Sequence, residues 1–248
     1  MIPIPLLATV GGALANSLPE FHCGTPDAPE ASMLDKIMGR ERMCKWPTTD
    51  LSYGFKSYLP GLGEKTQRKI SRAVSDVIEA ACGVRWTEAP ASSATVVIGS
   101  GRGPRANFDG PGGVLAWAEL PCGAQRQVEE VFDLDEKWVE QLGNQAVLQI
   151  LYFAVDLHER LHAMGVPHAP ANVAGTNIMA PVYSPKVAAL GPWDVQQLQL
   201  RYGPPAAKPP VQPPVNPPTL PSFPVEFDWA TATFVYAGKS YGLTPKAG

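Results

Sequence analysis

Residues 157–168 read LHERLHAMGVPH and hold three of the four histidines in the chain. His158 and His162 are four residues apart, so both imidazoles project from one face of a helix. Gly165 allows a sharp turn after that helix, and the turn can bring His168 back towards the same face. The sequence therefore predicts a fold in which a histidine-bearing helix and the segment after it converge on one point.

Three neutral imidazoles suit zinc and leave its fourth tetrahedral position open for water. Zinc lowers the pKa of that water to roughly 7, and a neighbouring carboxylate, here Glu159, can take its proton. The alternative is a helix with two ordinary histidines, because H-E-x-x-H alone also arises by chance. The third histidine and the glycine favour a catalytic zinc site with His158, His162 and His168 as ligands and Glu159 as general base.

The composition fits one moderate domain with appendages. The chain has 248 residues, of which 45% are hydrophobic and 17% charged, so it can bury a core. The net charge is −3 and no run is rich in lysine or arginine, which argues against nucleic acid as a partner. No apolar run is long enough to be a transmembrane segment.

The first residues bear on the compartment. MIPIPLLATVGGALANS is apolar and contains Ala13-Leu14-Ala15, which could be a signal-peptidase site, but it has no basic residue and is broken by Pro3 and Pro5. A cleaved signal and a retained segment both remain open, and we expect secretion. Among Cys44, Cys82 and Cys122 one disulfide is compatible with an oxidising compartment, with the pairing left open.

Hydrophobic periodicity and turn residues outline the elements and the domains. Strands are expected at 50–58, 94–100 and within 108–120, and helices at 63–83, at roughly 144–164 and at 192–203. The organisation is a leader or short pro-segment at 1–44, a catalytic unit at 45–203, a stiff proline-rich linker at 204–224 and a β-like tail at 225–248. The tail is too small to be stable alone, so it would dock on the catalytic unit or on another protein.

The full pattern H-E-x-x-H-x-x-G-x-x-H resembles the metzincin signature. Met179, in NIMAPVYSP eleven residues after His168, resembles the methionine turn of that family. Over 45–203 the chain is similar to the matrixins, the matrix metalloproteinase family: KWPTTDLSYGFKSYLPGL looks like the first strand and PWDVQQLQLRYG like the closing helix. Leu161 stands where the family usually has glycine, so the chain is a divergent member.

The resemblance implies an α+β metzincin fold. Its twisted, mostly parallel five-stranded sheet has one antiparallel edge strand, and it is accompanied by two long helices and a C-terminal helix. It also implies calcium, since FDGPGGVLAWAELP and VFDLDEKW match the family's calcium-binding segments. Calcium takes carboxylate and carbonyl oxygens, whereas the alternative is an ordinary Asx turn beside a solvated acidic face. The expected ligands are the carboxylates of Asp109, Asp133 and Glu136 and the backbone at Gly110, Gly112 and Val114.

Two further expectations follow from the resemblance. The family's structural second zinc should be absent, because Trp117 and Val131 occupy positions of its ligating histidines. FHCGTPD resembles the matrixin cysteine switch, in which a leader thiolate occupies the open zinc position, although Phe21 and His22 replace the usual Pro-Arg. Cys23 would then ligate zinc in a latent state, whereas the alternative is an incidental loop cysteine.

The expected function is a zinc-dependent endopeptidase acting on protein or peptide substrates and kept latent by Cys23. An extended substrate would pair with the edge strand 114–119. A non-catalytic metal-binding or adhesion module, or a permanently latent protease within a larger assembly, remains the alternative. The expected substrate-binding residues are Leu115, Ala116, Ala118, Pro181 and Tyr183.

Overall fold

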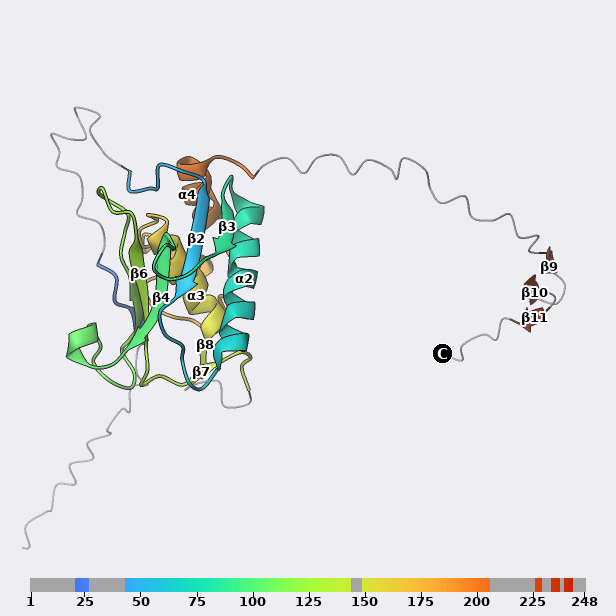
Figure 1. Cartoon of the computed structure of the whole chain (residues 1–248), viewed down its shortest axis with the longest axis horizontal. Coiled ribbons are helices and arrows are strands. Elements are labelled where there is room, and N and C mark those ends of the chain that lie inside the picture. Colours follow the sequence, from blue (N-terminus) through green and yellow to red (C-terminus); the bar gives the residue numbers. More distant parts are fainter. Residues whose placement is uncertain are drawn as a thin grey trace, which may run out of the picture. The chain divides into compact units, whose positions relative to one another are not determined.

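The computed structural model describes residues 21–26, 43–143 and 149–205, together with the backbone of three short strands between 226 and 242. The chain divides into two compact units, Met1–Ala206 and Ala207–Gly248. In the first unit a sheet and helices pack together in layers (Figure 1). Within the described part of the chain, no helix is both long enough and apolar enough to cross a bilayer.

The sheet of the first unit has six strands in the order β1-β5-β6-β4-β2-β3. β5 and β6 are antiparallel, whereas every other neighbouring pair is parallel. This confirms the expected α+β architecture with a mostly parallel sheet and one antiparallel pair. The strands are β1 His22–Cys23, β2 Asp50–Phe55, β3 Arg85–Glu88, β4 Val96–Gly101, β5 Val114–Ala118 and β6 Val128–Asp133.

Beyond the five expected strands, the leader contributes the sixth. β1 runs parallel to β5 and pairs with what would otherwise be the edge of the sheet. An edge strand presents unpaired N–H and C=O groups that attract another extended chain. The leader therefore occupies the edge of β5, at which we expect an extended substrate to pair.

Among the described residues, three α-helices accompany the sheet: α2 Glu64–Ala81, α3 Tyr152–Ala163 and α4 Pro192–Tyr202. The helix that carries the histidines begins at Tyr152, so the predicted start near 144 is wrong. Ile150–Leu151 instead form β8, which pairs in parallel with β7, Trp138–Val139. A short apolar run is compatible with a buried strand as well as a helix, which explains the difference. Residues 144–148 lie outside the described part.

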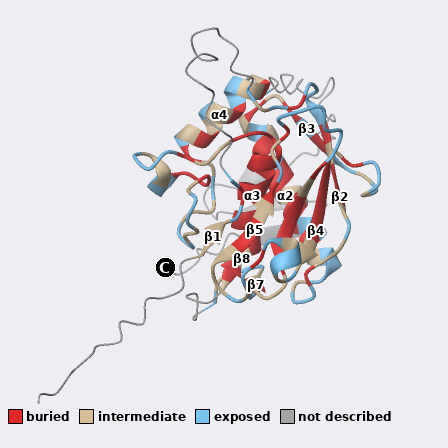
Figure 2. Cartoon of the chain, turned by 90° about the vertical axis from the view of Figure 1, so that its left-hand side faces the viewer, coloured by how far each residue is buried: buried red, intermediate tan, exposed pale blue. Residues whose placement is uncertain are grey.

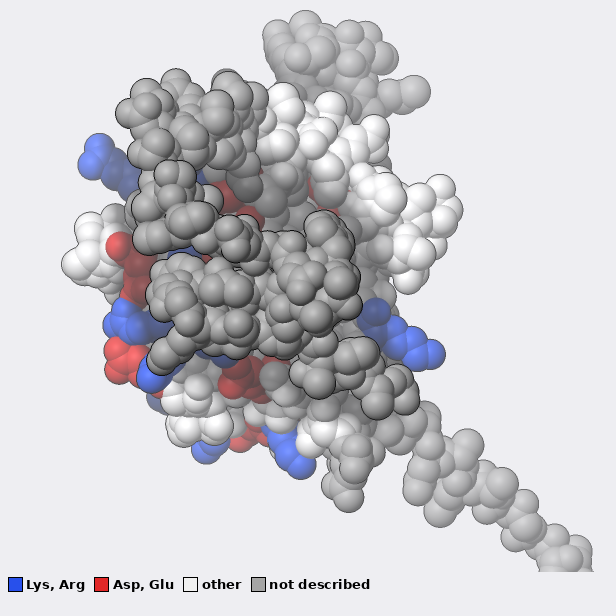
Figure 3. Space-filling model, turned by 90° about the vertical axis from the view of Figure 1, so that its right-hand side faces the viewer, with Lys and Arg blue, Asp and Glu red and all other residues white. Residues whose placement is uncertain are grey.

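α2 is amphipathic, with its apolar side against the core and charged side chains in solvent. Its outer face carries ion pairs, including Arg68 with Glu64 at 2.9 Å and Lys69 with Glu140 at 2.7 Å. In Figure 3, several of the visible Lys and Arg side chains lie beside Asp and Glu side chains. Exposed pairs of this kind contribute little to stability, so α2 is held mainly by its buried face.

α3 is different, because eleven of its twelve residues are buried (Figure 2). It nevertheless carries a charge inside the core. The Arg160 guanidinium pairs with Glu130 at 2.7 Å and with Asp156 at 3.1 Å, and all three side chains are fully buried. Tyr53 and Trp86 lie against the same guanidinium, 4.8 and 4.9 Å from its central carbon. Buried charges are tolerated when they are paired in this way, and the network fixes α3 against β6.

A disulfide joins Cys44 to Cys122, which settles the pairing that the sequence left open, while Cys23 and Cys82 are free thiols. The disulfide also positions the start of the domain against the histidine turn. Gly165 has φ +87°, and a Cβ there would lie 2.0 Å from the carbonyl oxygen of Cys44. Only glycine fits both the backbone conformation and this close approach.

The second unit is a small antiparallel sheet in the order β11-β10-β9. Its strands are β9 Glu226–Asp228, β10 Thr233–Tyr236 and β11 Lys239–Gly242. The alternating tail thus forms a three-stranded meander. The proline-rich linker lies almost wholly outside the described residues, and docking of the tail stays a prediction.

Candidate metal centre and active site

The structure brings His158, His162, His168 and Cys23 together. One ligand atom from each lies within 4.8 Å of the other three, and no second cluster of this kind occurs in the described part of the chain. The Nε2 atoms of His162 and His168 are 3.2 Å apart. Nitrogens about 2.0–2.1 Å from a tetrahedral ion lie roughly 3.3–3.4 Å from each other, so this spacing fits zinc.

Backbone carbonyls orient two of the imidazoles. His158 Nδ1 is 2.7 Å from the Ile178 oxygen, and His162 Nδ1 is 2.8 Å from the Val166 oxygen. A carbonyl only accepts, so Nδ1 carries the proton and Nε2 keeps its lone pair. The Nε2 atom of His158 is buried and has no hydrogen-bond partner. A buried lone pair of this kind is what a metal ion would satisfy.

Burial keeps these imidazoles neutral. It lowers the pKa of His158 to about 4, against the opposing hydrogen bond to Ile178. Burial also lowers the pKa of His162 well below its usual range, and the neighbouring histidines lower it further. Neutral imidazole is the form that binds a metal, so the site has the protonation state that zinc requires.

Asp194, which the sequence analysis did not single out, holds the loop that contains Ile178 and Met179, next to the three histidines. Its carboxylate accepts hydrogen bonds from the backbone N–H groups of Ile178 at 2.7 Å, Met179 at 3.3 Å and Gly191 at 2.7 Å. Met179 is completely buried. Because the Ile178 carbonyl orients His158, Asp194 fixes the position of a candidate ligand through one intervening residue.

The carboxylate of Glu159 lies beside the cluster and is 1% exposed. Its Oε2 atom is 3.7 Å from the Cys23 sulfur and 3.3 Å from the Thr25 hydroxyl. Burial raises the pKa of Glu159 to about 8, while the hydrogen bond from Cys23 opposes that rise and the charge of Glu130 adds to it. Cys23 and Thr25 of the leader therefore both contact Glu159, the residue expected to act as general base.

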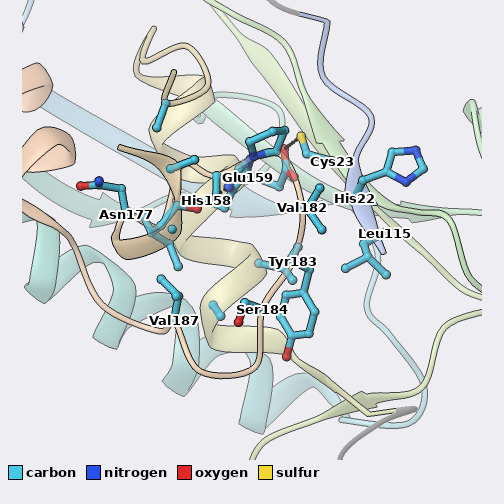
Figure 4. Close-up of a pocket in the computed structure, with 18 of the residues that line it drawn as sticks. His22, Cys23, Leu115, His158, Glu159, Asn177, Val182, Tyr183, Ser184 and Val187 are labelled. Carbon is cyan, nitrogen blue, oxygen red and sulfur yellow. Dashed lines mark hydrogen bonds between the residues drawn. The ribbon is translucent and has the colours of Figure 1, made fainter. Parts of the chain in front are cut away.

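The leader enters the groove as an extended segment with partners on both sides. On the β5 side, His22 N–H donates to Gly113 and Gly24 N–H to Ala116, each at 2.8 Å. On the other side, Cys23 N–H donates to the Pro181 carbonyl at 3.0 Å. Figure 4 shows the Cys23 side chain reaching towards Glu159. The groove can therefore hold an extended chain between β5 and the loop that follows Met179.

An apolar pocket of about 380 Å³ opens beside the cluster (Figure 4). The Tyr183 hydroxyl accepts the N–H of Leu151 at 3.0 Å, which ties the loop wall to the start of α3. Such a cavity suits an uncharged side chain. Its lining includes Leu115, Ala154, Val155, Pro181, Tyr183 and Val187.

Comparison with known proteins agrees with this geometry. Residues 45–203 match the Peptidase_M10 family, described as Matrixin. The chain belongs to the matrixins. It is 33% identical over 206 residues to matrix metalloproteinase-16 of Rattus norvegicus and of Homo sapiens, which covers 76% of this chain and 33% of either relative. Stromelysin-3 of Mus musculus is 30% identical over 203 residues, covering 79% of this chain and 39% of the relative.

The chain thus spans roughly a third of the length of these relatives. The matched region contains β2 to β8, all three helices and the histidine cluster, whereas β1 with Cys23 lies before it. Matrixins as a family are metalloendopeptidases, enzymes that hydrolyse peptide bonds.

The three acids expected to bind calcium in this matrixin lie near enough to influence one another's pKa, although their carboxylate oxygens do not converge as the zinc-site atoms do. Asp109 Oδ1 accepts the Val114 N–H at 3.0 Å, and Glu136 Oε1 accepts the Gly112 N–H at 2.5 Å. Burial raises the pKa of Glu136, and the charges of Asp133 and Asp109 raise it further. Asp133 Oδ2 is buried without a hydrogen-bond partner. A buried, unpartnered carboxylate oxygen amid other carboxylates fits a cation.

The turn between these acids depends on glycine. Gly110, Gly112 and Gly113 have φ of +96°, +81° and +88°. A Cβ on Gly113 would lie 2.3 Å from an Asp109 carboxylate oxygen. The run of glycines thus allows a tight loop that turns its backbone around Asp109.

Trp117 and Val131 are directly opposite each other on β5 and β6. The indole N–H of Trp117 donates to the Ala106 carbonyl at 2.8 Å. Trp117 and Val131 both line a second cavity of about 210 Å³. Neither side chain offers a metal ligand. The absence of a second zinc stays a prediction.

Proposed function

We propose that this matrixin is a zinc endopeptidase that hydrolyses proteins and that its leader keeps it latent. The observation that carries the proposal is the convergence of His158, His162 and His168 beside the buried carboxylate of Glu159. When bound, zinc would polarise the scissile carbonyl and lower the pKa of the attacking water to roughly 7.

Glu159 would move the proton. In the latent form its Oε2 atom faces the Cys23 thiol and the Thr25 hydroxyl. Once the leader leaves, the same carboxylate can accept a proton from the attacking water and deliver it to the nitrogen of the departing amine. A purely structural metal site has no need of this carboxylate, which argues against a non-catalytic module.

The substrate would take the place of the leader. The carbonyls of Gly113 and Ala116 already accept hydrogen bonds from an extended segment, and an extended substrate can use the same edge of β5. The pocket walled by Ala154, Val155 and Tyr183 would take an apolar side chain next to the cleaved bond.

Calcium and secretion complete the proposal. Asp109, Asp133 and Glu136, with backbone groups of the loop 110–114, would hold Ca²⁺ and so brace the start of β5. The Cys44–Cys122 disulfide supports an oxidising, extracellular compartment. We expect the C-terminal unit to dock on the catalytic unit or on another protein.

The test compares the leader-free forms of wild type and Glu159→Gln in casein cleavage, with zinc measured on both. Glutamine keeps the shape of the side chain but cannot take a proton, so cleavage should fall about 10²–10⁴-fold while zinc stays bound. Glu64→Gln, which changes an exposed glutamate at the start of α2, is the matched control. Equal cleavage, or none by wild type, with zinc present in both proteins would rule out the enzymatic proposal.

A further inference from the structure

We infer that the hydroxyl group of Thr25 is a second latency contact, distinct from the Cys23 thiol, which blocks the edge of β5 and the Glu159 carboxylate together. The inference rests on the proposed function, since latency presupposes an enzyme. It assigns a specific task to a side chain on the leader rather than to its backbone.

Thr25 is the only buried residue of the described leader segment 21–26, and it is 4% exposed. Its Oγ1 atom accepts the Ala118 N–H at 2.8 Å. The same atom is 3.2 Å from the Ala118 carbonyl oxygen and 3.3 Å from Glu159 Oε2. A hydroxyl has one proton and two lone pairs, so it accepts from Ala118 and donates to one of these two oxygens at a time.

The position of Thr25 follows from the close approach of Gly24 to β5. A Cβ on Gly24 would lie 2.6 Å from Cγ1 of Val114, so a side chain there would displace Val114. Gly24 pairs with Ala116 through its backbone, and Thr25 is the next residue that can offer a side chain. At Ala118, therefore, the leader replaces a backbone pair with a hydroxyl.

This contact blocks two requirements of catalysis. The N–H and C=O groups of Ala118 end β5, where an extended substrate would continue its pairing. Glu159 Oε2 is an acceptor that the attacking water needs. Thr25 also supports the thiol, because its own backbone N–H donates to Cys23 Sγ at 3.2 Å. The hydroxyl therefore opposes substrate entry even where the thiol does not bind metal.

The test uses the zinc-loaded full chain as wild type, Thr25→Val and Thr25→Ser. Valine has the shape of threonine but leaves the Ala118 N–H without a partner, whereas serine keeps the hydroxyl. Leader opening is read from the rate at which a thiol reagent modifies Cys23. The modified residue is located by peptide mass mapping because Cys82 is a second free thiol. We expect Thr25→Val to raise that rate about 10-fold and Thr25→Ser to change it less than about threefold.

Cleavage by the unprocessed chain is the second readout and should rise about as much in Thr25→Val. Limited proteolysis that removes the leader makes wild type and variant the same protein, so their kcat/KM values must then agree. Wild-type labelling and cleavage rates in unprocessed Thr25→Val would overturn the inference. Absence of cleavage by processed wild type would instead overturn the proposed function, while the labelling rates still test the Thr25 contact.

A peptide experiment covers the case in which a variant folds poorly. Synthetic FHCGTPD and FHCGVPD are compared as inhibitors of the processed enzyme. The valine peptide should inhibit about 10-fold more weakly. Equal inhibition would count against the hydroxyl contact.

Discussion

The sulfur of Cys23 lies 3.7 Å from Oε2 of Glu159, although 136 residues separate the two in the sequence. The leader therefore brings a thiol to the point at which three imidazoles and the proposed general base already meet. Hydrolysis needs both an open ligand position and a free carboxylate. Departure of one short segment would free both together.

Replacing Cys23 by alanine should make the unprocessed chain active. The variant loses a ligand for zinc but keeps the backbone hydrogen bonds of β1 and the hydroxyl of Thr25. Each loss of about 1.4 kcal/mol in leader binding raises the open fraction tenfold. We expect cleavage of a fluorogenic peptide to rise at least tenfold yet stay below that of the processed enzyme. No rise would remove Cys23 from the latency mechanism.

We expect one zinc per chain, measured by elemental analysis of the purified protein. His162→Ala should lose this zinc, because its Nε2 atom faces that of His168 at 3.2 Å. His22→Ala, which changes the fourth histidine, should keep it. Binding to the folded state alone raises stability, so chelation should lower the melting temperature of wild type and of His22→Ala. A second tightly bound zinc would contradict the expectation that Trp117 and Val131, at positions of ligating histidines, leave the chain without a structural zinc site.

Calcium should raise the melting temperature of the wild type, and Asp133→Asn should weaken this effect. Asp133 Oδ2 is buried without a partner, so an amide there removes a charged ligand. Saturation at a hundred times the dissociation constant would stabilise by about 2.7 kcal/mol. Asp76→Asn, which changes an exposed acid on α2, should keep the response to calcium. A wild type that does not respond to calcium would remove this site.

The sequence predicted the His158–His168 segment because that segment depends on a short-range pattern, whereas the mixed sheet was expected only from the resemblance to the matrixins. Histidines at i and i+4 must share a helix face, and Gly165 must mark the turn that follows. The start of α3 was not predictable in this way. Ile150 and Leu151 are apolar residues that fit a buried strand as well as a buried helix, and only their pairing with β7 favours the strand.

The contacts of Thr25, Asp194 and Arg160 were not predictable from the sequence for a related reason. Each acts through partners distant in the chain, and no local pattern reveals those partners. Asp194 reads as an ordinary acid in the first turn of a helix, where it favours the helix start. Arg160 gave a usable signal, since Asp156 lies four residues earlier in a segment that is otherwise largely apolar.

Removing the disulfide should destabilise the protein without removing zinc. Cys44 and Cys122 are 78 residues apart, and closing a loop of that length stabilises the folded state by about 4 kcal/mol on the chain-entropy account. We expect the double serine variant to melt about 8–16 °C lower. A reductant should lower the melting temperature of the wild type and leave the double variant unchanged. Equal melting temperatures would show that the crosslink does not support the domain.

Asp194→Ala should destabilise the loop around Ile178 and Met179 as well as the fold. Three backbone N–H groups, those of Ile178, Met179 and Gly191, would lose their acceptor in a buried place. That loss should cost about 3 kcal/mol, or roughly 6–12 °C in melting temperature. Asp76→Ala, which removes an exposed acid from α2, should cost less than about 1 kcal/mol.

The same variant separates positioning from stability. Because Ile178 orients His158 through its carbonyl, Asp194→Ala should also weaken zinc binding about 10–100-fold, measured by competition with a chelator at a temperature where the protein is folded. Asp76→Ala should bind zinc as wild type does. Lower stability with unchanged zinc affinity would confine Asp194 to a structural role.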